Sequence, residues 1–239
     1  SDVAFKEEWW NEWEIRPYTM NAYIMCDPAH SRKRESNRTA IAVVGVDGNY
    51  NKFLLDGVCH RLSLSERWSA LKMLRTKWKT APGIREVKVG YERYGAQSDI
   101  EHFKEMMRID GSSFPVYELN WTGGGGPQSK RDRIQRLEPD LKDGSFFFPY
   151  PTDEKRLTSH QKDYKIKKQE YLISKKILRK DEEGKVYDLA DWVRRNEYLL
   201  FPTIHPDFLD ALSRIYDMEP MPPISRNRRS LEPDAEARF

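Results

Sequence analysis

The sequence predicts an α/β domain built on a central mixed sheet. Three strand-like segments come first along the chain, and helices and strands then alternate. Short connections between the first three segments favour antiparallel neighbours, whereas strand–helix–strand connections favour parallel neighbours with right-handed crossovers. We therefore expect the first strand to lie in the centre of the sheet, between the second strand and the fourth.

The composition is that of a folded protein. The 239 residues include 7 Trp, 12 Tyr and 10 Phe, which is too many aromatic residues for a disordered chain. No apolar run approaches the roughly 18–20 residues of a membrane span, and the first residues do not have the pattern of a secretory signal. The two cysteines, Cys26 and Cys59, fit neither a disulfide framework nor a zinc site. The formal net charge of +3 gives little information about binding partners.

The first three strands follow from apolar runs and one turn. Residues 23–28 read YIMCDP, an apolar run that ends at a proline, which cannot continue a strand ladder. Thr39–Val46 is rich in β-branched residues and predicts the second strand. The Asp-Gly-Asn sequence at residues 47–49 predicts a hairpin turn into a third strand at Lys52–Val58.

Helices and strands then alternate. A capping box at residues 63–66 begins a helix that reaches residue 79. Residues 86–91 predict the fourth strand and residues 115–119 the fifth, with a helix over residues 97–107 between them. Beyond them we expect a basic helix at 129–141, a short strand at 146–148, and helices at 189–200 and 207–218.

The two ends of the chain are expected to lie outside this domain. Trp9, Trp10 and Trp13 fit one face of a short helix, which is compatible with a segment packed on the domain edge. We interpret residues 1–20 as the remnant of a linker. Residues 21–218 then form the domain. Residues 219–239 contain several prolines and no apolar periodicity, so we expect a flexible C-terminal tail.

The predicted strand order, 3-2-1-4-5, is that of the ribonuclease H-like fold, and it brings acidic residues together. Asp27 ends the first strand and Glu92 ends the fourth, and parallel neighbours lie roughly 4.8 Å apart. Asp207 and Asp210 are three residues apart and share one face of the last helix. If that helix packs beside the first strand, three or four carboxylates converge at one edge of the sheet.

Converging carboxylates indicate a metal site. Hard oxygen ligands suit Mg²⁺ or Mn²⁺, and two such ions about 3.5–4 Å apart can promote phosphodiester hydrolysis. Taken alone, each acid has a simpler interpretation. Asp27 fits a turn, Glu92 a solvated strand end, Asp207 a helix cap and Asp210 a position that flanks the core. Their shared placement is the reason to predict a site.

Basic residues are concentrated in three stretches, and each is expected to contact DNA phosphates or simply to form a solvated face. The first two comprise Arg32, Lys33, Arg34 and Arg38, and Lys130, Arg131, Arg133 and Arg136. The third is residues 152–180, which contain ten Lys and Arg against four Asp and Glu. We expect these stretches to surround the acidic edge. Phosphate contacts are independent of sequence, so we expect low sequence specificity.

Four motifs resemble the nuclease domain of bacteriophage large terminase subunits. They are DPA at residues 27–29, YERYG at 91–95, the stretch with KRDRI, LEP and Gly at 130–144, and HPDFLDALS at 205–213. The resemblance implies a metal-dependent endonuclease that cuts concatemeric double-stranded viral DNA during genome packaging. It implies that Asp27 and Glu92 are metal ligands and that Asp210, Asp207 or both complete the site. The family often has two adjacent acids where this chain has Pro206-Asp207, which leaves the main third ligand open.

The resemblance also implies partners and a location. Family members carry an N-terminal ATPase domain with a P-loop. In this chain the spacing between the glycine run at 123–126 and Lys130 is not that of a P-loop. We therefore interpret the chain as a C-terminal domain. The implied partners are double-stranded DNA, the small terminase subunit and the portal, with no membrane. The implied location is the host cytoplasm, with transient association with the procapsid.

Two alternatives remain open. Another ribonuclease H-like nuclease, such as a Holliday-junction resolvase, would carry similar acids, and its preference for branched DNA would distinguish it. A non-catalytic module that docks DNA or the portal through basic surfaces would show no metal-dependent cleavage.

Overall fold

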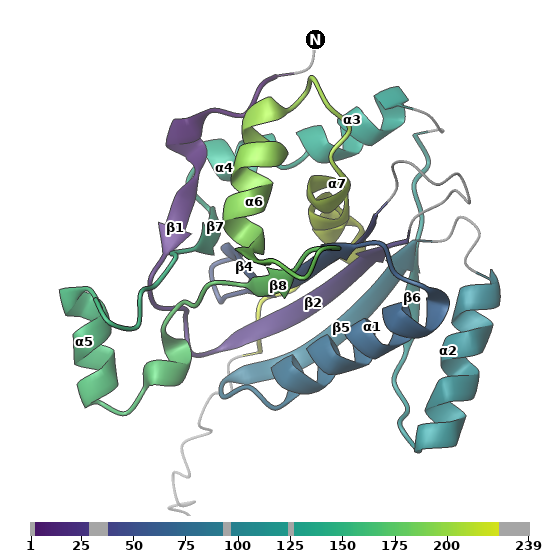
Figure 1. Ribbon diagram of the computed structural model, residues 1–239, viewed down its shortest axis with the longest axis horizontal. Coiled ribbons are helices and arrows are strands. Elements are labelled where there is room, and N and C mark those ends of the chain that lie inside the picture. The colour runs from purple at the N-terminus through teal and green to yellow at the C-terminus, as the bar shows by residue number, and fades with distance from the viewer. Residues whose placement is uncertain (1–2, 29–37, 93–96, 124–126, 225–239) are drawn as a thin grey trace, which may run out of the picture.

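The computed structural model describes residues 3–28, 38–92, 97–123 and 127–224 (Figure 1). Within these ranges, a mixed sheet has the order β1-β7-β4-β3-β2-β5-β6, and β8 pairs with β9 in a separate hairpin. The strands are β1 (Asn11–Trp13), β2 (Met20–Asp27), β3 (Thr39–Val46), β4 (Lys52–His60), β5 (Ile84–Glu92), β6 (Val116–Leu119), β7 (Phe146–Pro149), β8 (Leu178–Lys180) and β9 (Val186–Asp188).

The sheet confirms the predicted ribonuclease H-like order. Strands β2, β3 and β4 form an antiparallel meander, and β5 and β6 continue the sheet in parallel on the other side of β2. The predicted order 3-2-1-4-5 is therefore the observed β4-β3-β2-β5-β6. Two strands extend this core, because β7 pairs in parallel with β4 and β1 pairs in parallel with β7.

Helices cover both faces of the sheet (Figure 1). The helices are α1 (Leu64–Lys79), α2 (Gln97–Asp110), α3 (Pro127–Gln135), α4 (Glu138–Lys142), α5 (Ser159–Ile166), α6 (Leu189–Asn196) and α7 (Asp207–Ser213). Helices α1 and α2 pack on one face, where Trp68, Phe103 and Phe114 stack in the core. Helices α3, α4, α6 and α7 pack on the other face. Among the described residues, none of the helices is both long enough and apolar enough to cross a membrane.

The N-terminal residues belong to the sheet. The predicted short helix is wrong, because only a 3₁₀ turn at Glu7–Trp9 is present and strand β1 follows it. The Trp13 indole donates to the Leu54 carbonyl oxygen at 3.0 Å, and the Trp10 ring stacks on Phe148 with 3.6 Å between centroids. Burying these large rings against the sheet favours an extended backbone over a helix. Residues 3–20, the described part of the segment that we interpreted as a linker, therefore pack with the domain.

Three predicted helices are shorter than expected. The basic helix at 129–141 divides into α3 and α4, because Pro139 lacks an N–H group and its ring would clash with the carbonyl of Gln135 in a continuous helix. Helix α6 gives way to a 3₁₀ turn at Tyr198–Leu200, and α7 gives way to another at Arg214–Met218.

The basic residues 152–174 do not surround the acidic edge, so that expectation is wrong for this part of the chain. They pack beside the segment after β1, where Glu14 accepts hydrogen bonds from the Thr158 hydroxyl at 2.7 Å and from the Ser174 N–H at 2.8 Å. Figure 1 shows α5 beyond the end of β2 that is opposite Asp27. Local charge indicates a solvated surface, but it carries no information about the end of the sheet on which that surface lies.

The first residues of the predicted tail contact the sheet. The Met221 carbonyl oxygen accepts hydrogen bonds from Asn21 at 3.1 Å and from the Tyr23 hydroxyl at 3.2 Å, and the Met221 N–H donates back to Tyr23. Residues 225–239 of the expected flexible tail lie outside the described residues. Cys26 and Cys59 are both buried and free.

Candidate active site

Two parallel strands bring Asp27 and Glu92 to one edge of the sheet. Cys26 of β2 lies beside Tyr91 of β5, so the next residue of each strand, Asp27 and Glu92, ends its strand at the same level. The apolar runs that precede both acids are buried in the core, which fixes the position of the strand ends. Glu92 is itself buried, and Asp27 is partly exposed.

Helix α7 brings Asp207 and Asp210 to the same edge. Pro206 precedes the helix and supplies no side-chain cap. The buried carboxylate of Glu197 takes that role, because it accepts hydrogen bonds from the backbone N–H groups of Asp207 and Phe208 at 3.1 Å and of Leu209 at 2.9 Å. Glu197 therefore holds the start of the helix that carries both acids.

The pKa of Asp27 is affected by two of the other acids. Burial raises the pKa of Asp27 well above its usual value, and the negative charges of Asp210 and Glu92 raise it further. Lys130 and Arg133 oppose this effect. Three carboxylates from β2, β5 and α7 thus converge, and the principal partner of Asp27 from α7 is Asp210.

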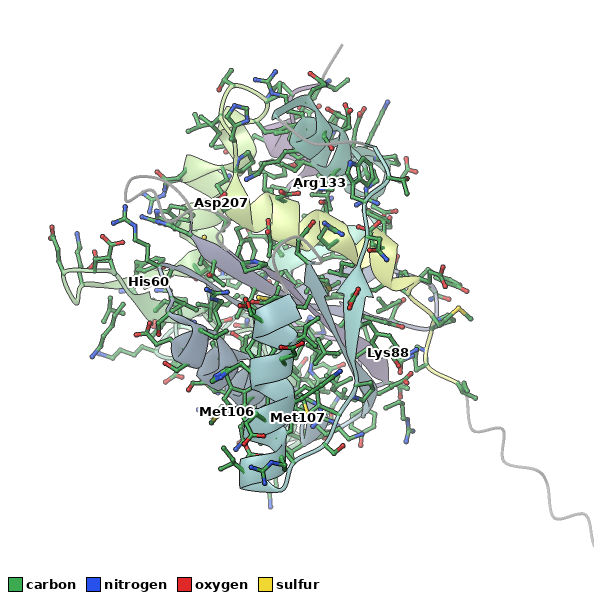
Figure 2. The ribbon with its side chains drawn as sticks, turned by 90° about the vertical axis from the view of Figure 1, so that its right-hand side faces the viewer. His60, Lys88, Met106, Met107, Arg133 and Asp207 are labelled. Atoms are coloured by element: carbon green, nitrogen blue, oxygen red, sulfur yellow. The ribbon has the colours of Figure 1, made fainter. Side chains whose placement is uncertain are left out.

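Basic side chains neutralise the convergent acids. The Arg133 guanidinium donates to both oxygens of Asp210, at 2.9 and 2.7 Å. The Lys130 ammonium lies 2.8 Å from Asp207 Oδ1 and 3.8 Å from Asp210 Oδ2. The fully buried Arg214 forms an ion pair with Glu92. Figure 2 shows Arg133 and Asp207 on the side of the molecule where α7 lies.

The pKa values of the two cations on α3 reflect this environment. Burial by itself would lower the pKa of Lys130, but Asp207 and Asp210 outweigh it and the pKa is raised. Burial opposes the charge of Arg133 in the same way, while its hydrogen bonds to Asp210 and the charges of Glu92 and Asp27 raise the pKa. The cluster therefore favours a positive charge at its centre.

The donor chemistry of this cluster fits a hard divalent cation. Its convergent groups are carboxylates, which provide the oxygen ligands that Mg²⁺ and Mn²⁺ prefer. Within the described residues, however, no group of three or more His, Cys, Asp and Glu side chains is arranged to hold a metal ion. Arg133, Lys130 and Arg214 occupy carboxylate oxygens instead. A metal ion would therefore have to displace at least part of this ion-paired arrangement.

The residues predicted to bind DNA are placed in different ways. Arg32, Lys33 and Arg34 lie outside the described residues. Lys130 and Arg133 are directed at the acids, and Arg131 is half-buried on the same helix. Arg136 pairs with Asp217 at 2.7 Å. The Arg38 N–H lies 3.4 Å from Asp207 Oδ2, while its guanidinium lies over the ring of Trp192.

Two residues of the site were not predicted. Arg214 follows Asp210 by about one helical turn, and this spacing is a usable signal for a side chain on the same face. The Glu197 carboxylate caps α7 across a loop, and no local pattern in the sequence indicates that contact.

Comparison with known proteins gave only distant similarities. No family model matches the sequence, and no curated protein matches it. The structure is similar to the human cytomegalovirus terminase nuclease domain, with TM-score 0.44, 13% identity, and coverage of 90% of this chain and 89% of that chain. For the fowlpox virus Holliday junction resolvase the TM-score is 0.40 and the identity is 14%, with coverage of 83% of this chain and 97% of that chain. For the large terminase nuclease domain of Thermus phage P74-26 the TM-score is 0.39 and the identity is 14%, with coverage of 85% of this chain and 82% of that chain. Likeness at this level assigns no function.

Proposed function

We propose that this protein is a divalent-metal-dependent endonuclease that hydrolyses phosphodiester bonds in double-stranded DNA. The observation that carries the proposal is the convergence of Asp27, Glu92 and Asp210 from two strand ends and one helix, with the pKa of Asp27 raised by burial and by the other two acids. Buried like charges are costly unless cations accompany them, and Lys130, Arg133 and Arg214 serve that role in this structure. In the proposed function, these carboxylates would bind the metal ions that act on a phosphodiester substrate.

In this proposal Asp27, Glu92 and Asp210 hold the metal, and Asp207 contributes from the margin of the site. When bound, a pair of Mg²⁺ or Mn²⁺ ions would supply an activated water and stabilise the leaving oxygen. Arg133 and Lys130, which pair with Asp210 and Asp207 in this structure, would then be available to contact DNA phosphates. These contacts select no base, which accounts for the low sequence specificity that we propose.

The biological substrate that we propose is concatemeric viral DNA at genome packaging. The four sequence motifs that resemble terminase nuclease domains support this choice. The proposal includes a covalently linked N-terminal ATPase domain, and the small terminase subunit and portal as partners. It places the protein in the host cytoplasm, in transient association with the procapsid.

The test is plasmid digestion with Mg²⁺ or Mn²⁺ by the wild type and by Asp27→Asn, Glu92→Gln and Asp210→Asn. We expect each substitution to reduce cleavage by about a hundredfold or more, the scale of losing one key electrostatic group. Asp191→Asn is the matched control, because Asp191 forms an exposed ion pair with Arg195. Calorimetric titration with Mn²⁺ should show weaker binding in the three site variants and unchanged binding in the control.

Three outcomes would contradict the proposal in different ways. Undiminished cleavage by the site variants would refute the assigned residues. Strong preference for a four-way junction over linear duplex would indicate a junction resolvase. Absence of cleavage by the wild type with either metal would favour a non-catalytic DNA-docking module.

A further inference from the structure

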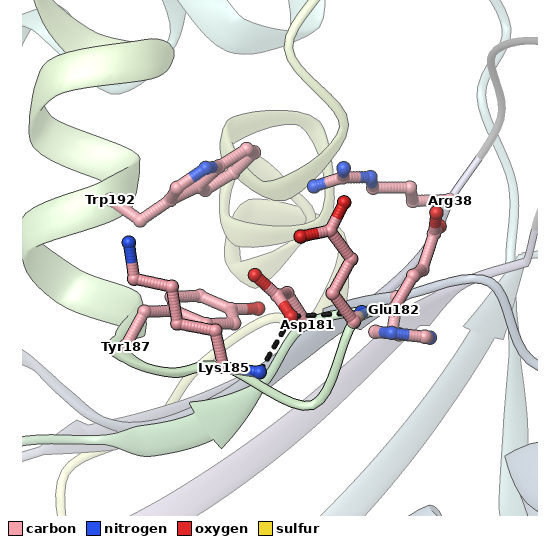
Figure 3. A pocket seen from close by; sticks show the side chains of 8 residues that line it. Arg38, Asp181, Glu182, Lys185, Tyr187 and Trp192 are labelled. Carbon is pink, nitrogen blue, oxygen red and sulfur yellow. Dashed lines mark hydrogen bonds between the residues drawn. The ribbon is translucent and has the colours of Figure 1, made fainter.

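A pocket of about 410 Å³ lies beside the acidic cluster (Figure 3). It is formed between the β8–β9 hairpin, α6 and the strand ends of β3 and β4. Its lining consists of Arg38, His60, residues 181–183, Lys185, Tyr187 and Trp192. The volume lies within the range of about 300–1,000 Å³ that small-molecule pockets occupy.

The wall formed by the hairpin is held in place by charged and polar contacts. Arg179 of β8 donates to Asp56 Oδ1 at 2.7 Å and to the Gly57 carbonyl oxygen at 2.9 Å. These hydrogen bonds connect β8 to β4. Asp181 organises the turn by accepting the N–H groups of Glu183 and Lys185 at 2.9 and 2.8 Å. The pocket is therefore a built feature of the fold.

Two aromatic side chains give the pocket a surface for a flat ring. Tyr187 and Trp192 are half-buried, with 6.5 Å between their ring centroids and 61° between their planes. The Arg38 guanidinium lies 5.1 Å from the centroid of Trp192, and Figure 3 shows Arg38 reaching across the pocket toward this ring. Aromatic rings and arginine planes are the surfaces on which unstacked nucleobases rest in proteins.

The charges of the lining favour a base over a phosphate. Three acids at residues 181–183 line the pocket with Arg38, Lys185 and His60, and Glu182 also pairs with Arg61 at 3.5 Å. The lining and Arg61 together carry no excess positive charge that would attract a phosphate. Carboxylates accept hydrogen bonds from exocyclic amino groups, such as the amino group of cytosine. An uncharged ring with an amino edge therefore suits the pocket.

The pocket lies next to the acidic site, and Arg38 belongs to the surroundings of both. The Arg38 N–H lies 3.4 Å from Asp207 Oδ2, although the Arg38 side chain lines the pocket. In the sheet, Ala40 of β3 lies between Asp27 of β2 and Cys59 of β4, and His60 follows Cys59. Two strand spacings of roughly 4.8 Å thus separate Asp27 from the pocket edge, a distance that a DNA strand spans in a few nucleotides.

We propose that this pocket binds one unpaired nucleobase of a DNA strand held at the acidic cluster. The base stacks on Trp192 with its amino edge toward the carboxylates, and Arg38 turns to the adjacent phosphate. The base belongs to a nucleotide within a few positions of the cleaved bond. This inference rests on the proposed nuclease function for the location of the strand, but base binding itself requires no catalysis.

The experiment uses the intact chain and short DNA duplexes in EDTA, so that no cleavage occurs. One duplex has a splayed end with 2-aminopurine at an unpaired position, and its partner has the same sequence fully paired. Anisotropy at fixed salt measures affinity, and 2-aminopurine fluorescence measures stacking. The variants are Trp192→Leu, the conservative Trp192→Phe, and Tyr171→Ala, which removes an exposed aromatic ring outside the pocket.

The wild type and Tyr171→Ala should quench the fluorescence and prefer the splayed duplex by about tenfold, the scale of one stacked base. Trp192→Leu should lose both effects, and Trp192→Phe should retain most of each. Because Trp192 also packs against the core, a second measurement is made on the wild type alone: splayed cytosine should bind more tightly than splayed thymine, which has no amino group.

The possible outcomes distinguish failure of the proposed base-binding pocket from failure of the proposed nuclease function. Equal affinity for splayed and paired DNA without quenching overturns the pocket, even if plasmid cleavage with Mn²⁺ proceeds. Quenching that persists in Trp192→Leu also overturns it, as does a preference for thymine. Quenching and preference in a protein that cleaves no DNA support the pocket and overturn the proposed nuclease.

Discussion

Arg133 and Asp210 form a two-pronged ion pair that is almost completely removed from solvent. The guanidinium donates from Nε and Nη2 to the two carboxylate oxygens, and the side chains are 14% and 2% exposed. Arg108 and Glu105 form the same kind of fork on the surface of α2, where the side chains are 72% and 52% exposed. The two pairs share their geometry and differ in burial.

Removal of the buried guanidinium should be costly. Arg133→Ala is expected to lower the free energy of unfolding by about 3–5 kcal/mol, because it leaves Asp210 without its principal partner. Arg108→Ala should change it far less, because solvent screens the exposed pair. Urea titration measures both. Addition of Mn²⁺ should then stabilise Arg133→Ala more than the wild type, and equal responses would show that the ion and the guanidinium do not compete.

Glu197 should make stability depend on pH. Burial raises the pKa of this carboxyl to about 7, although the N–H groups of Phe208 and Leu209 lower it. Since the pKa in the folded state exceeds the usual value, the associated stabilisation is complete below about pH 4.5 and is lost as the pH rises through 7. We expect about 2–3 kcal/mol of stability to be lost between pH 5 and pH 8 in the wild type and retained in Glu197→Gln. Urea titrations at both pH values test this, and parallel losses in the two proteins would argue against it.

Gly57 should not tolerate a side chain. A Cβ atom there would lie 2.7 Å from the Phe208 ring and 2.9 Å from the Ile41 carbonyl oxygen. Gly57→Ala is expected to lower the free energy of unfolding by about 1–3 kcal/mol and to displace α7, which also reduces cleavage. Gly48→Ala is the control, because no atom lies within 4 Å of its added Cβ, and a change within about 0.5 kcal/mol is expected. Similar losses in both variants would indicate a general effect of losing glycine.

Arg179 should control the order of the β8–β9 hairpin. Arg179→Ala removes the bonds to Asp56 and Gly57, while Asp56 keeps Lys77 and Trp78 as partners. Hydrogen exchange of the hairpin amides is expected to accelerate about tenfold, since a hydrogen bond to a charged group contributes about 1.5–3 kcal/mol. Exchange in β2 and β3 should be unchanged. Arg195→Ala, which removes an exposed ion pair, should not change the hydrogen exchange of the hairpin amides.

The sheet core was predictable because its signals are local. The Asp47–Gly48 turn sets the β3–β4 hairpin, and the capping box at Ser63 starts the helix that leads to β5. The places of β1 and β7 were not predictable, because their parallel pairing joins segments that are distant in the chain and leave no pattern in either one.

The candidate site was predictable to a similar extent. Asp27 and Glu92 lie at the predicted strand ends, and α7 brings Asp210 to them, as the spacing and strand order indicate. The ion pairs of Arg133 and Arg214 were not predictable, because a basic residue on a helix is equally compatible with solvent, DNA or a buried acid. Only the packing of α3 and α7 against the sheet decides among these.

The acidic cluster also has a consequence for folding. Asp27 is among the early residues of the domain and Asp210 is among its last, and long loop closure must precede any contact between them. A chain in which the sheet has formed but α7 has not docked contains Asp27 and Glu92 without Asp210. If the proposed cleavage needs all three acids, it should appear only once α7 has docked, which would make cleavage a reporter of the completed native state.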